Sequence, residues 1–300
     1  MTRTVLVAGA AGRVGRLVAR RLADRGITVR RLLRTMPADG MPGRHGSLVG
    51  DFNDATCMAG AFAGTDAAFL YAPAPGAGKA VMQAARQAGV RHVVLLSSAS
   101  VTKAPPGVNP IAERHREAEG ALQSAGLAWT FVRPDTMASN CLQWAPDIRQ
   151  QARVYTAYPE SLRCPVHEDD IALLAVESLL DDRHQGHAYD ITGPELLSIR
   201  EQVQCIARHL GTGVQCVAIP DAQAVARMLS SSPGLTPTGA ARLLDYLRRS
   251  VTAPPHLSDD FRRAIGQTPR RFDDWVGENL AAFQAAPTAP RAPPRREVGT

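Results

Sequence analysis

The chain has 300 residues, 45% of them hydrophobic and 21% charged, which suits one large α/β domain with a full core and an added lobe. Its formal net charge is +6, but only two of its 34 basic residues are lysines, and the arginines are dispersed. This dispersed charge argues against nucleic-acid binding, and no apolar run approaches the roughly 18 residues of a membrane span.

Cysteine usage indicates the compartment. The five cysteines are odd in number and form no CxxC pair, which predicts a reducing cytoplasm without a disulfide framework or a metal site. The first residues run directly into an apolar strand, so we expect no signal peptide.

The start of the chain carries the main motif. The apolar run 5–7 ends in glycine, Gly9, Gly12 and Gly15 recur at three-residue spacing, and apolar residues then return at helical spacing from Val14. In a dinucleotide site Gly9 permits a sharp turn, Gly12 lets backbone approach a phosphate, and Gly15 lets the helix lie on the strand. The free amides at the helix start bind the anion. The alternative is a tight turn without a ligand.

Residues 27–34 read as the second strand. The carboxyl end of this strand meets the adenosine ribose, where an acid binds the 2′-hydroxyl of NAD and an arginine suits the 2′-phosphate of NADP. Arg34 stands at this end, and no acid occurs between Thr28 and Pro37. We therefore predict NADP(H), with Arg31 as the alternative phosphate partner. The alternative is that Arg31 and Arg34 are only solvated charges at the end of the strand.

The stretch LVGDFND places two candidates near the adenine. Asp51 and Phe52 suit the adenine edge, but Asp51 or Asn53 equally suits the cap of the helix that follows. Residues 66–75 read as a strand whose tip of small residues and prolines should lie beside the cofactor phosphates.

A run of hydroxyls follows the buried strand at 93–96. Ser97, Ser98 and Ser100 stand at its carboxyl end, where the nicotinamide and the substrate meet in dinucleotide folds. The alternative is that these serines are only polar residues that end the strand.

Residues 135–165 read as irregular and carry large apolar side chains suited to a substrate wall or lid. These side chains are Met137, Leu142, Trp144, Tyr155 and Tyr158. Ordinary packing under a long loop is the alternative.

The cluster at 167–170, which reads HEDD, resembles a metal site. Acid-rich first turns of helices are common, so we predict no metal there.

Several stretches taken together resemble the atypical short-chain dehydrogenase/reductase superfamily, and within it the NmrA-like branch of NAD(P)H-binding proteins. They are VLVAGAAGRVGRLV, VRRLLR, GDFND, HVVLLSSAS, GLAWTFVRP, PVHEDDIA, YDITGPELLS and IGQTPRRFDDWVGENLAAF. The resemblance extends to about Phe283. It implies a Rossmann-type doubly wound parallel sheet with a smaller C-terminal α+β substrate lobe.

The implied domains follow from this fold. An NAD(P)-binding domain spans 1–150 and is completed by about 165–195, while 135–165 and 196–285 form the substrate-binding lobe. The proline- and arginine-rich segment 286–300 is expected to be disordered.

The resemblance also assigns residues. Ser98 falls where the superfamily's catalytic serine lies. The predicted contacts to NADP(H) are Gly9, Ala11, Gly12, Arg13, Val14, Gly15, Arg34, Asp51, Phe52, Ala72, Pro73, Ser97 and Pro134.

The catalytic Tyr-x-x-x-Lys pair of the superfamily is missing. Counted back from Gly126, its tyrosine falls at Ile111 and its lysine at His115. Isoleucine cannot donate a proton, whereas His115 can either hydrogen-bond the ribose or protonate a substrate.

These observations favour an NADPH-dependent oxidoreductase that reduces a small organic acceptor, such as a quinone, enone, imine or ketone, in secondary-metabolite biosynthesis. A conjugated acceptor needs little acid catalysis, since the protein supplies orientation and electrostatics. The alternatives are a non-catalytic NADP(H)-sensing regulator and a non-redox isomerase, epimerase or cyclase. We expect a small-molecule partner, no membrane or nucleic acid, and a monomer or homodimer.

Overall fold

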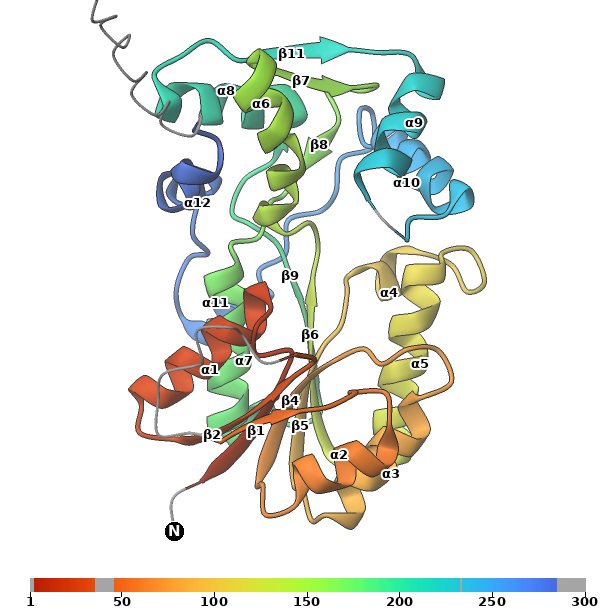
Figure 1. Cartoon of the computed structure of the whole chain (residues 1–300), viewed down its shortest axis with the longest axis vertical. Helices are drawn as coiled ribbons and strands as arrows, with labels where there is room; N and C mark the ends of the chain where they lie inside the picture. Colours follow the sequence, from red (N-terminus) through yellow and green to blue (C-terminus); the bar gives the residue numbers. More distant parts are fainter. Residues whose placement is uncertain (1–2, 36–45, 233, 285–300) are drawn as a thin grey trace, which may run out of the picture.

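A seven-stranded parallel sheet organises the fold in the computed structural model, which describes residues 3–35, 46–232 and 234–284 (Figure 1). The strands, in sheet order, are β3 (Ser47–Val49), β2 (Thr28–Leu33), β1 (Thr4–Ala8), β4 (Ala67–Tyr71), β5 (His92–Leu96), β6 (Ala128–Pro134) and β9 (His187–Ile191). The order reverses between β1 and β4, which opens a crevice at the carboxyl ends of the strands. The predicted Rossmann-type α/β fold is confirmed.

Continuous apolar runs form the central strands because both sheet faces are covered. Val5, Leu6 and Val7 of β1 are fully buried, and Val5 pairs with Val29 of β2 and Ala67 of β4. The edge strand β3 was not predicted: Leu48 and Val49 are exposed, so no apolar pattern marked it.

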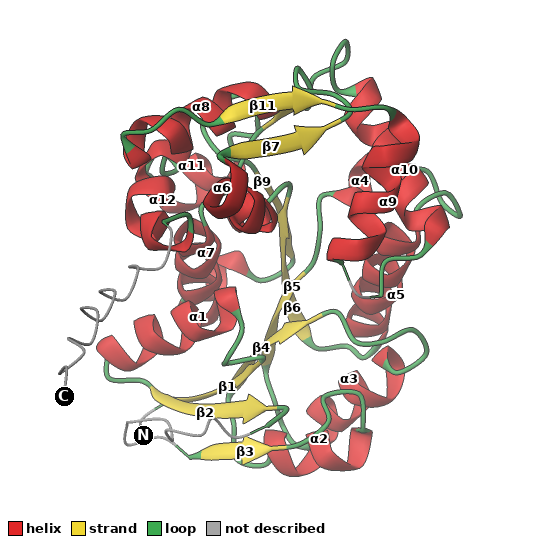
Figure 2. Cartoon of the chain, turned by 45° about the horizontal axis from the view of Figure 1, so that its top comes forward, coloured by secondary structure: helices red, strands yellow, loops and turns green. Residues whose placement is uncertain are grey.

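Helices cover both faces of the sheet (Figure 2). One face carries α1 (Arg13–Asp24), α7 (Glu168–Leu180) and α11 (Asp260–Ile265). The other carries α2 (Ala55–Phe62), α3 (Gly78–Gln87) and α5 (Pro110–Ser124). Two short elements, α4 (Ser100–Lys103) and η2 (Asp182–His184), follow β5 and α7.

A second lobe with its own core lies beyond the carboxyl edge of the sheet (Figure 1). Its first elements are η1 (Ala138–Trp144), α6 (Ala145–Gln151), β7 (Arg153–Thr156) and β8 (Leu162–Arg163). The others are β10 (Leu197–Ser198), α8 (Ile199–Leu210), β11 (Gln215–Ala218), α9 (Asp221–Ser231), α10 (Pro237–Arg249), α12 (Phe272–Asn279) and η3 (Leu280–Ala282). β8 pairs with β10 and β7 with β11.

Two expectations about this lobe need correction. The segment 135–165 is not irregular, because it holds η1, α6, β7 and β8; β7 pairs with a strand some 60 residues away in sequence, which local reading cannot detect. The lobe is also not continuous over 196–285, since Phe261 of α11 is buried in the core of the sheet domain. Residues 286–300, the expected disordered tail, lie outside the described residues.

The acidic run at the start of α7 joins the two parts of the molecule. His167 Nδ1 accepts the Asp169 amide at 3.1 Å, and buried Glu168 accepts Trp275 Nε1 at 2.7 Å and the Ser139 amide at 2.9 Å. Asp170 accepts the Arg270 amide at 2.8 Å. This run therefore acts as a helix start and an anchor for α12 and η1.

None of the described helices is long and apolar enough to cross a membrane.

We expect Gly15→Ala to destabilise the fold, because a Cβ there would lie 2.2 Å from the Gly9 carbonyl oxygen and 2.8 Å from its carbon. Overpacking of this kind costs about 1–3 kcal/mol, and backbone cannot yield cheaply. Gly60→Ala is the matched control: it lies in α2 with nothing within 4 Å, so it should be neutral or slightly stabilising. Urea unfolding measures both, and equal stability of the Gly15 variant and the unmodified protein would contradict the contact.

Candidate functional site

The turn between β1 and α1 is built by three glycines. Gly9 has φ +63°, which favours glycine, and its carbonyl accepts the Gly12 amide at 2.8 Å. Tyr71 covers Gly9: a Cβ there would lie 3.1 Å from the Tyr71 ring. Gly15 packs on Gly9 so closely that no side chain fits. The geometric roles predicted for Gly9 and Gly15 are thus present.

The first turn of α1 suits an anion. It holds no acidic residue, and Gly12, the N-cap, offers no capping side chain, so the first amides keep their donors for a ligand. Ala11 is exposed beside them, whereas the Val14 side chain is buried in the core and leaves only its backbone to the site. Arg13 reaches across the crevice and donates to Ser139 Oγ at 3.0 Å. These features fit a dinucleotide pyrophosphate.

Three residues meet where β1, β2 and β4 end. Arg34 is exposed and interacts with the Tyr71 hydroxyl, and Asp51 lies close to the same hydroxyl. Burial raises the pKa of Tyr71, so the phenol stays neutral. Tyr71 was missed in the sequence, although its place as the last residue of a strand at the carboxyl edge was a usable signal.

The ring of Phe52 does not face the site where β1, β2 and β4 end. It is 4% exposed and packs on Tyr71 with ring centroids 4.3 Å apart, so only its backbone is left for an adenine. Arg31 is 7% exposed, and its Nε and Nη1 have no hydrogen-bond partner among the described residues. Arg31 therefore remains an alternative partner for a 2′-phosphate.

Of the two alternatives for LVGDFND, the one in which Asp51 or Asn53 caps the next helix is wrong. Asp54, rather than Asp51 or Asn53, caps α2 by accepting the Thr56 amide at 2.8 Å. Asp51 instead accepts the Asn53 amide at 2.9 Å, and Asn53 Oδ1 accepts the Ala74 amide at 2.8 Å. The stretch thereby holds the tip of β4 in place.

The tip of β4 is held from the other side by α5. Arg114 donates to the carbonyl oxygens of Ala72 and Pro73, the latter at 2.9 Å. Both predicted contacts are buried, and Arg114 fixes the position of their backbone. No sequence pattern pointed to Arg114.

Ser97 and Pro134 belong to a buried network between β5, β6 and α5. The Ser97 hydroxyl donates to Glu119 at 2.5 Å, and Glu119 accepts two bonds from Arg133, at 2.8 and 2.6 Å. The Pro134 carbonyl accepts the Ala99 amide at 3.0 Å. The polar atoms of both predicted contacts are thus used within the protein.

Ser98 presents its hydroxyl differently. Its oxygen accepts the Ser100 amide at 3.2 Å and the Ser100 hydroxyl at 2.9 Å. Because the oxygen accepts both bonds, its own proton is free to be donated. Ser98 is partly exposed at the end of β5, as a substrate-facing residue would be.

His115 is neutral in this structure. Burial, with help from the Arg114 charge, lowers its pKa to about 4, and its buried Nδ1 has no partner. Ile111, in the tyrosine slot, is 61% exposed. Near pH 7 an imidazole with this pKa is almost entirely unprotonated and so cannot act as an acid, which leaves a hydrogen bond to the ribose as the other predicted role. The structure therefore favours the ribose alternative.

The proposed substrate wall is mostly packing. Leu142, Trp144 and Tyr158 pack on the core of the lobe, and Met137 packs on the core of the sheet domain. The Arg227 guanidinium lies 4.4 Å from the centre of the Tyr155 ring.

A cluster near Asp135 faces the end of β5 instead. Asp135 accepts Lys103 Nζ at 2.9 Å and the Cys164 thiol at 2.8 Å. Arg163 lies next along β8, with its guanidinium 4.1 Å from the Tyr246 ring centre. No local pattern in the sequence brought these residues together.

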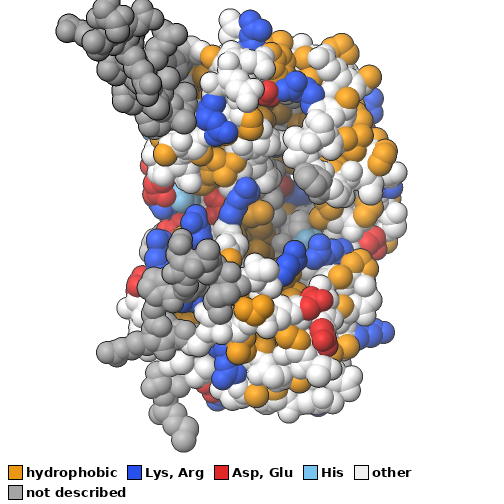
Figure 3. Space-filling view, viewed as in Figure 1, with side chains coloured by type: hydrophobic (Ala, Val, Ile, Leu, Met, Phe, Trp, Pro, Cys, Tyr) orange, Lys and Arg blue, Asp and Glu red, His pale blue; other side chains and the backbone are white. Residues whose placement is uncertain are grey.

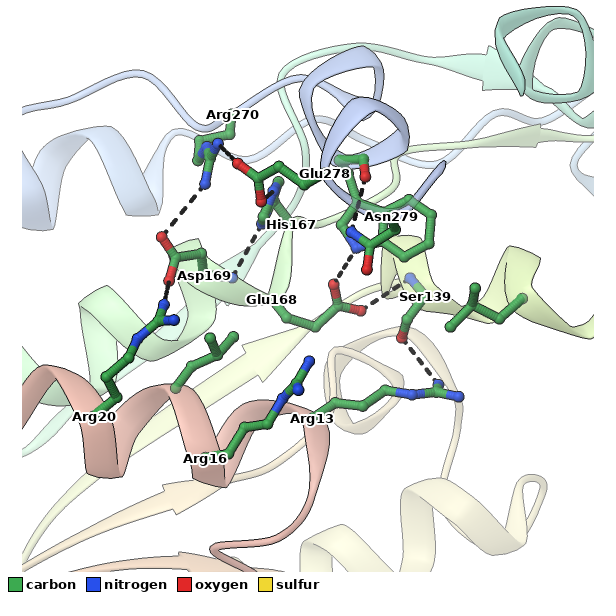
Figure 4. A pocket seen from close by; sticks show the side chains of 13 residues that line it. Arg13, Arg16, Arg20, Ser139, His167, Glu168, Asp169, Arg270, Glu278 and Asn279 are labelled. Carbon is green, nitrogen blue, oxygen red and sulfur yellow. Dashed lines mark hydrogen bonds and ion pairs between the residues drawn. The ribbon is translucent and has the colours of Figure 1, made fainter. Parts of the chain in front are cut away.

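A pocket of about 480 Å³ lies on the outer side of α1 (Figure 4). Arg13, Arg16 and Arg20 line one wall, and Arg270 lies opposite. Arg270 pairs with Asp169 at 3.4 Å and also with Glu278. The pocket is a polar junction between α1 and α12.

One group in the described part of the chain has metal-ligand spacing, namely Cys205, His209 and Asp273, with donor atoms within 4.8 Å. Burial raises the pKa of Cys205 to about 12, so its thiol stays protonated, and Arg208 lies 3.7 Å from Asp273. Neither feature favours a cation.

Residues 9–182 match a family model described as NAD(P)H-binding. The chain belongs to this NAD(P)H-binding family. The predicted NAD(P)H-binding family is thereby confirmed, and the predicted cofactor NADP(H) agrees with it.

Two relatives are reductases. A (4-alkanoyl-5-oxo-2,5-dihydrofuran-3-yl)methyl phosphate reductase of Streptomyces griseus is 37% identical over 93% of this chain and 99% of its own. An NAD(P)H azoreductase of Xenophilus azovorans is 29% identical over 94% and 100%. The chain is accordingly an NAD(P)H-dependent reductase of this family.

Solved structures share the fold. Citrobacter triphenylmethane reductase superposes with a TM-score of 0.77 at 19% identity, over 93% of this chain and 99% of that one. An Escherichia coli NADPH-dependent quinone oxidoreductase complexed with NADPH gives 0.75 at 19%, over 92% and 99%.

We expect His115→Ala to weaken NADP⁺ binding about tenfold, the cost of one hydrogen bond, without changing kcat. Since His115 stays neutral above about pH 4, the ratio of the variant's dissociation constant to that of the unmodified protein should be constant from pH 5.5 to 8. Fluorescence titration measures both constants, and the ratio cancels titration of the cofactor's own phosphate. A ratio that changes near pH 6.5, or a hundredfold drop in kcat, would restore the acid–base role.

Proposed function

We propose that the protein uses NADPH to reduce the conjugated C=C bond of a small carbonyl compound, an enone or an unsaturated lactone. The observation that carries the proposal is the reactive end of the site, where Ile111 and neutral His115 replace the tyrosine and lysine. A ketone needs a strong proton donor at its oxygen, whereas a conjugated C=C bond accepts hydride at carbon and delocalises the charge.

The similarity at 37% identity supports this acceptor class. The name of the Streptomyces relative describes an unsaturated five-membered lactone with an alkanoyl group, in which the C=C bond is conjugated. The azoreductase, the triphenylmethane reductase and the quinone oxidoreductase are named for dyes or quinones, which are conjugated acceptors as well.

The residues of this chain supply binding and polarisation. The glycine turn and the first turn of α1 hold the pyrophosphate, and bound NADPH supplies the hydride. Ser98 Oγ accepts two bonds from Ser100, so its own proton is free. The hydroxyl would donate this proton to a hydrogen bond with the acceptor's carbonyl oxygen. Water would then protonate the α-carbon of the resulting enolate, since His115 is almost entirely unprotonated near pH 7.

A cytoplasmic location and a monomeric or homodimeric state remain predictions from the sequence.

The acceptor panel tests the proposal. Purified protein with NADPH should oxidise the cofactor, followed at 340 nm, with 3-acyl-2(5H)-furanones and linear enones, and mass spectrometry should find products two hydrogens heavier. Saturated ketones should be unreactive. Ser98→Ala should lower kcat about 100- to 1,000-fold, the usual cost of one lost donor to a developing oxyanion, and leave the KM for NADPH unchanged.

Reduction of ketones in preference to enones would contradict the proposed acceptor class. Tight NADPH binding without turnover of any acceptor would favour the sensing regulator, and conversion of a compound without cofactor oxidation would favour a non-redox enzyme.

We expect NADPH to bind more tightly than NADH, because Arg34 is exposed just after β2 ends, where the 2′-phosphate of the adenosine ribose would lie. A charge-assisted contact contributes about 1.5–3 kcal/mol, or about ten- to a hundredfold in affinity. Arg34→Ala should erase most of the preference while leaving NADH affinity unchanged, as measured by fluorescence titration.

Arg91→Ala is the matched control. Arg91 is exposed and pairs with Asp66 at 2.8 Å, at the amino end of the sheet, away from the crevice. Equal affinity of the unmodified protein for NADPH and NADH would contradict the proposed role of Arg34.

A further inference from the structure

Arg163 of β8 is a buried cation without an anionic partner. It is 7% exposed, its Nη1 makes no hydrogen bond, and none of the described carboxylates lies within 4.0 Å of it. Its main contact is the face of Tyr246, 4.1 Å from the guanidinium carbon. Burying an unpaired charge costs free energy. An anion bound next to Arg163 would offset this cost, and the described residues do not provide one.

The groups around Arg163 leave a positive excess. The nearest carboxylate, Asp135, is already used by Lys103 Nζ at 2.9 Å and by the Cys164 thiol at 2.8 Å. Burial raises the pKa of Cys164, so the thiol adds no charge. Two cations therefore share one carboxylate.

The same cluster offers a neutral donor. The Tyr246 hydroxyl is buried and has no hydrogen-bond partner among the described residues, and burial raises the pKa of the phenol, which keeps its proton in place. Tyr246 lies near both cations: the Arg163 guanidinium carbon is 4.1 Å from the centre of its ring, and the charges of Arg163 and Lys103 both lower the pKa of its hydroxyl, against the larger effect of burial.

This cluster stands at the reactive end of the crevice. Lys103 ends α4, which begins two residues after Ser98, and Asp135 directly follows β6 at the carboxyl edge of the sheet. Arg163 and Tyr246 come from β8 and α10 of the second lobe, which faces that edge (Figure 1). The surface is hollowed between the two halves, and Lys and Arg side chains lie on its rim (Figure 3).

We propose that Arg163, Lys103 and Tyr246 form a subsite for a phosphate monoester carried by the acceptor. The inference rests on the proposed function in one respect, that the acceptor occupies this crevice. A phosphate monoester carries about 1.5–2 negative charges and three acceptor oxygens, which matches the unused donors and exceeds what one carboxylate neutralises.

The similarity to the Streptomyces relative is consistent with this chemistry, since that protein's name specifies a methyl phosphate ester. Nothing in that name assigns residues. The assignment to Arg163, Lys103 and Tyr246 comes from their burial and unused donors.

The test uses the protein saturated with NADP⁺, so that the anion sites of the cofactor are filled. Calorimetric titration with methyl phosphate should show one site. Arg163→Met should weaken binding at least tenfold, and Tyr246→Phe, which keeps the ring under the guanidinium, should weaken it a fewfold. Arg153→Met is the matched control, because Arg153 is exposed on β7 of the same lobe, and binding should be unchanged.

A kinetic arm separates this inference from the proposed function. With a lactone acceptor offered with and without its phosphate, the unmodified protein should show a lower KM for the phosphate ester, and Arg163→Met should bring the two KM values together without changing that of NADPH. Circular dichroism and retained NADP⁺ binding confirm that each variant is folded.

The outcomes are distinct. Methyl phosphate binding that is equally tight in Arg163→Met overturns the subsite, and so does acetate binding as tight as methyl phosphate, which would indicate a carboxylate ligand. Methyl phosphate binding that depends on Arg163, without reduction of any acceptor, supports the subsite and rejects the proposed reduction.

Discussion

The fold depends on how closely α1 lies against the turn that follows β1. Gly15 touches the Gly9 carbonyl at a distance that no side chain allows, and this contact fixes where the helix begins. Because the first turn of α1 carries neither an acid nor a capping side chain, its amides face the crevice with their donors free. The positive φ of Gly9 and the packing of Tyr71 on it serve the same placement. The cofactor site is therefore a consequence of backbone packing more than of side-chain chemistry.

Largely buried arginines lie on both sides of the crevice, one paired with a described carboxylate and one not. Under β5 and β6, Arg133 and Glu119 satisfy each other and hold Ser97, so this network stabilises the sheet and leaves nothing for a ligand. Across the crevice, Arg163 is buried more deeply than Arg133 but pairs with none of the described carboxylates, and the nearby Asp135 is already bonded to Lys103. The contrast between a closed and an open network is the physical basis for assigning structure to the first and ligand recognition to the second.

The loss of the tyrosine and lysine limits the chemistry in a definite direction. An exposed isoleucine and an imidazole held neutral by burial cannot deliver a proton early in the reaction. A serine hydroxyl whose oxygen is already bonded twice can still polarise a carbonyl. An acceptor whose own conjugation spreads the charge suits such a site, as does a substrate held by a distant anionic group, since orientation then replaces acid catalysis.

The sequence by itself determined the parallel sheet, the glycine turn and the place of Arg34, because each depends on a local pattern of apolar runs, glycine spacing or strand ends. It did not determine β3, whose residues are exposed, or the pairing of β7 with β11, which joins distant segments. It named Ser98 and His115, but only burial beside Arg114 decided that His115 is neutral. It did not indicate that Tyr246 lies beneath Arg163, because these residues are more than 80 positions apart and meet only where β8 and α10 come together within the second lobe. Local periodicity encodes elements, whereas burial and charge balance arise only from tertiary packing.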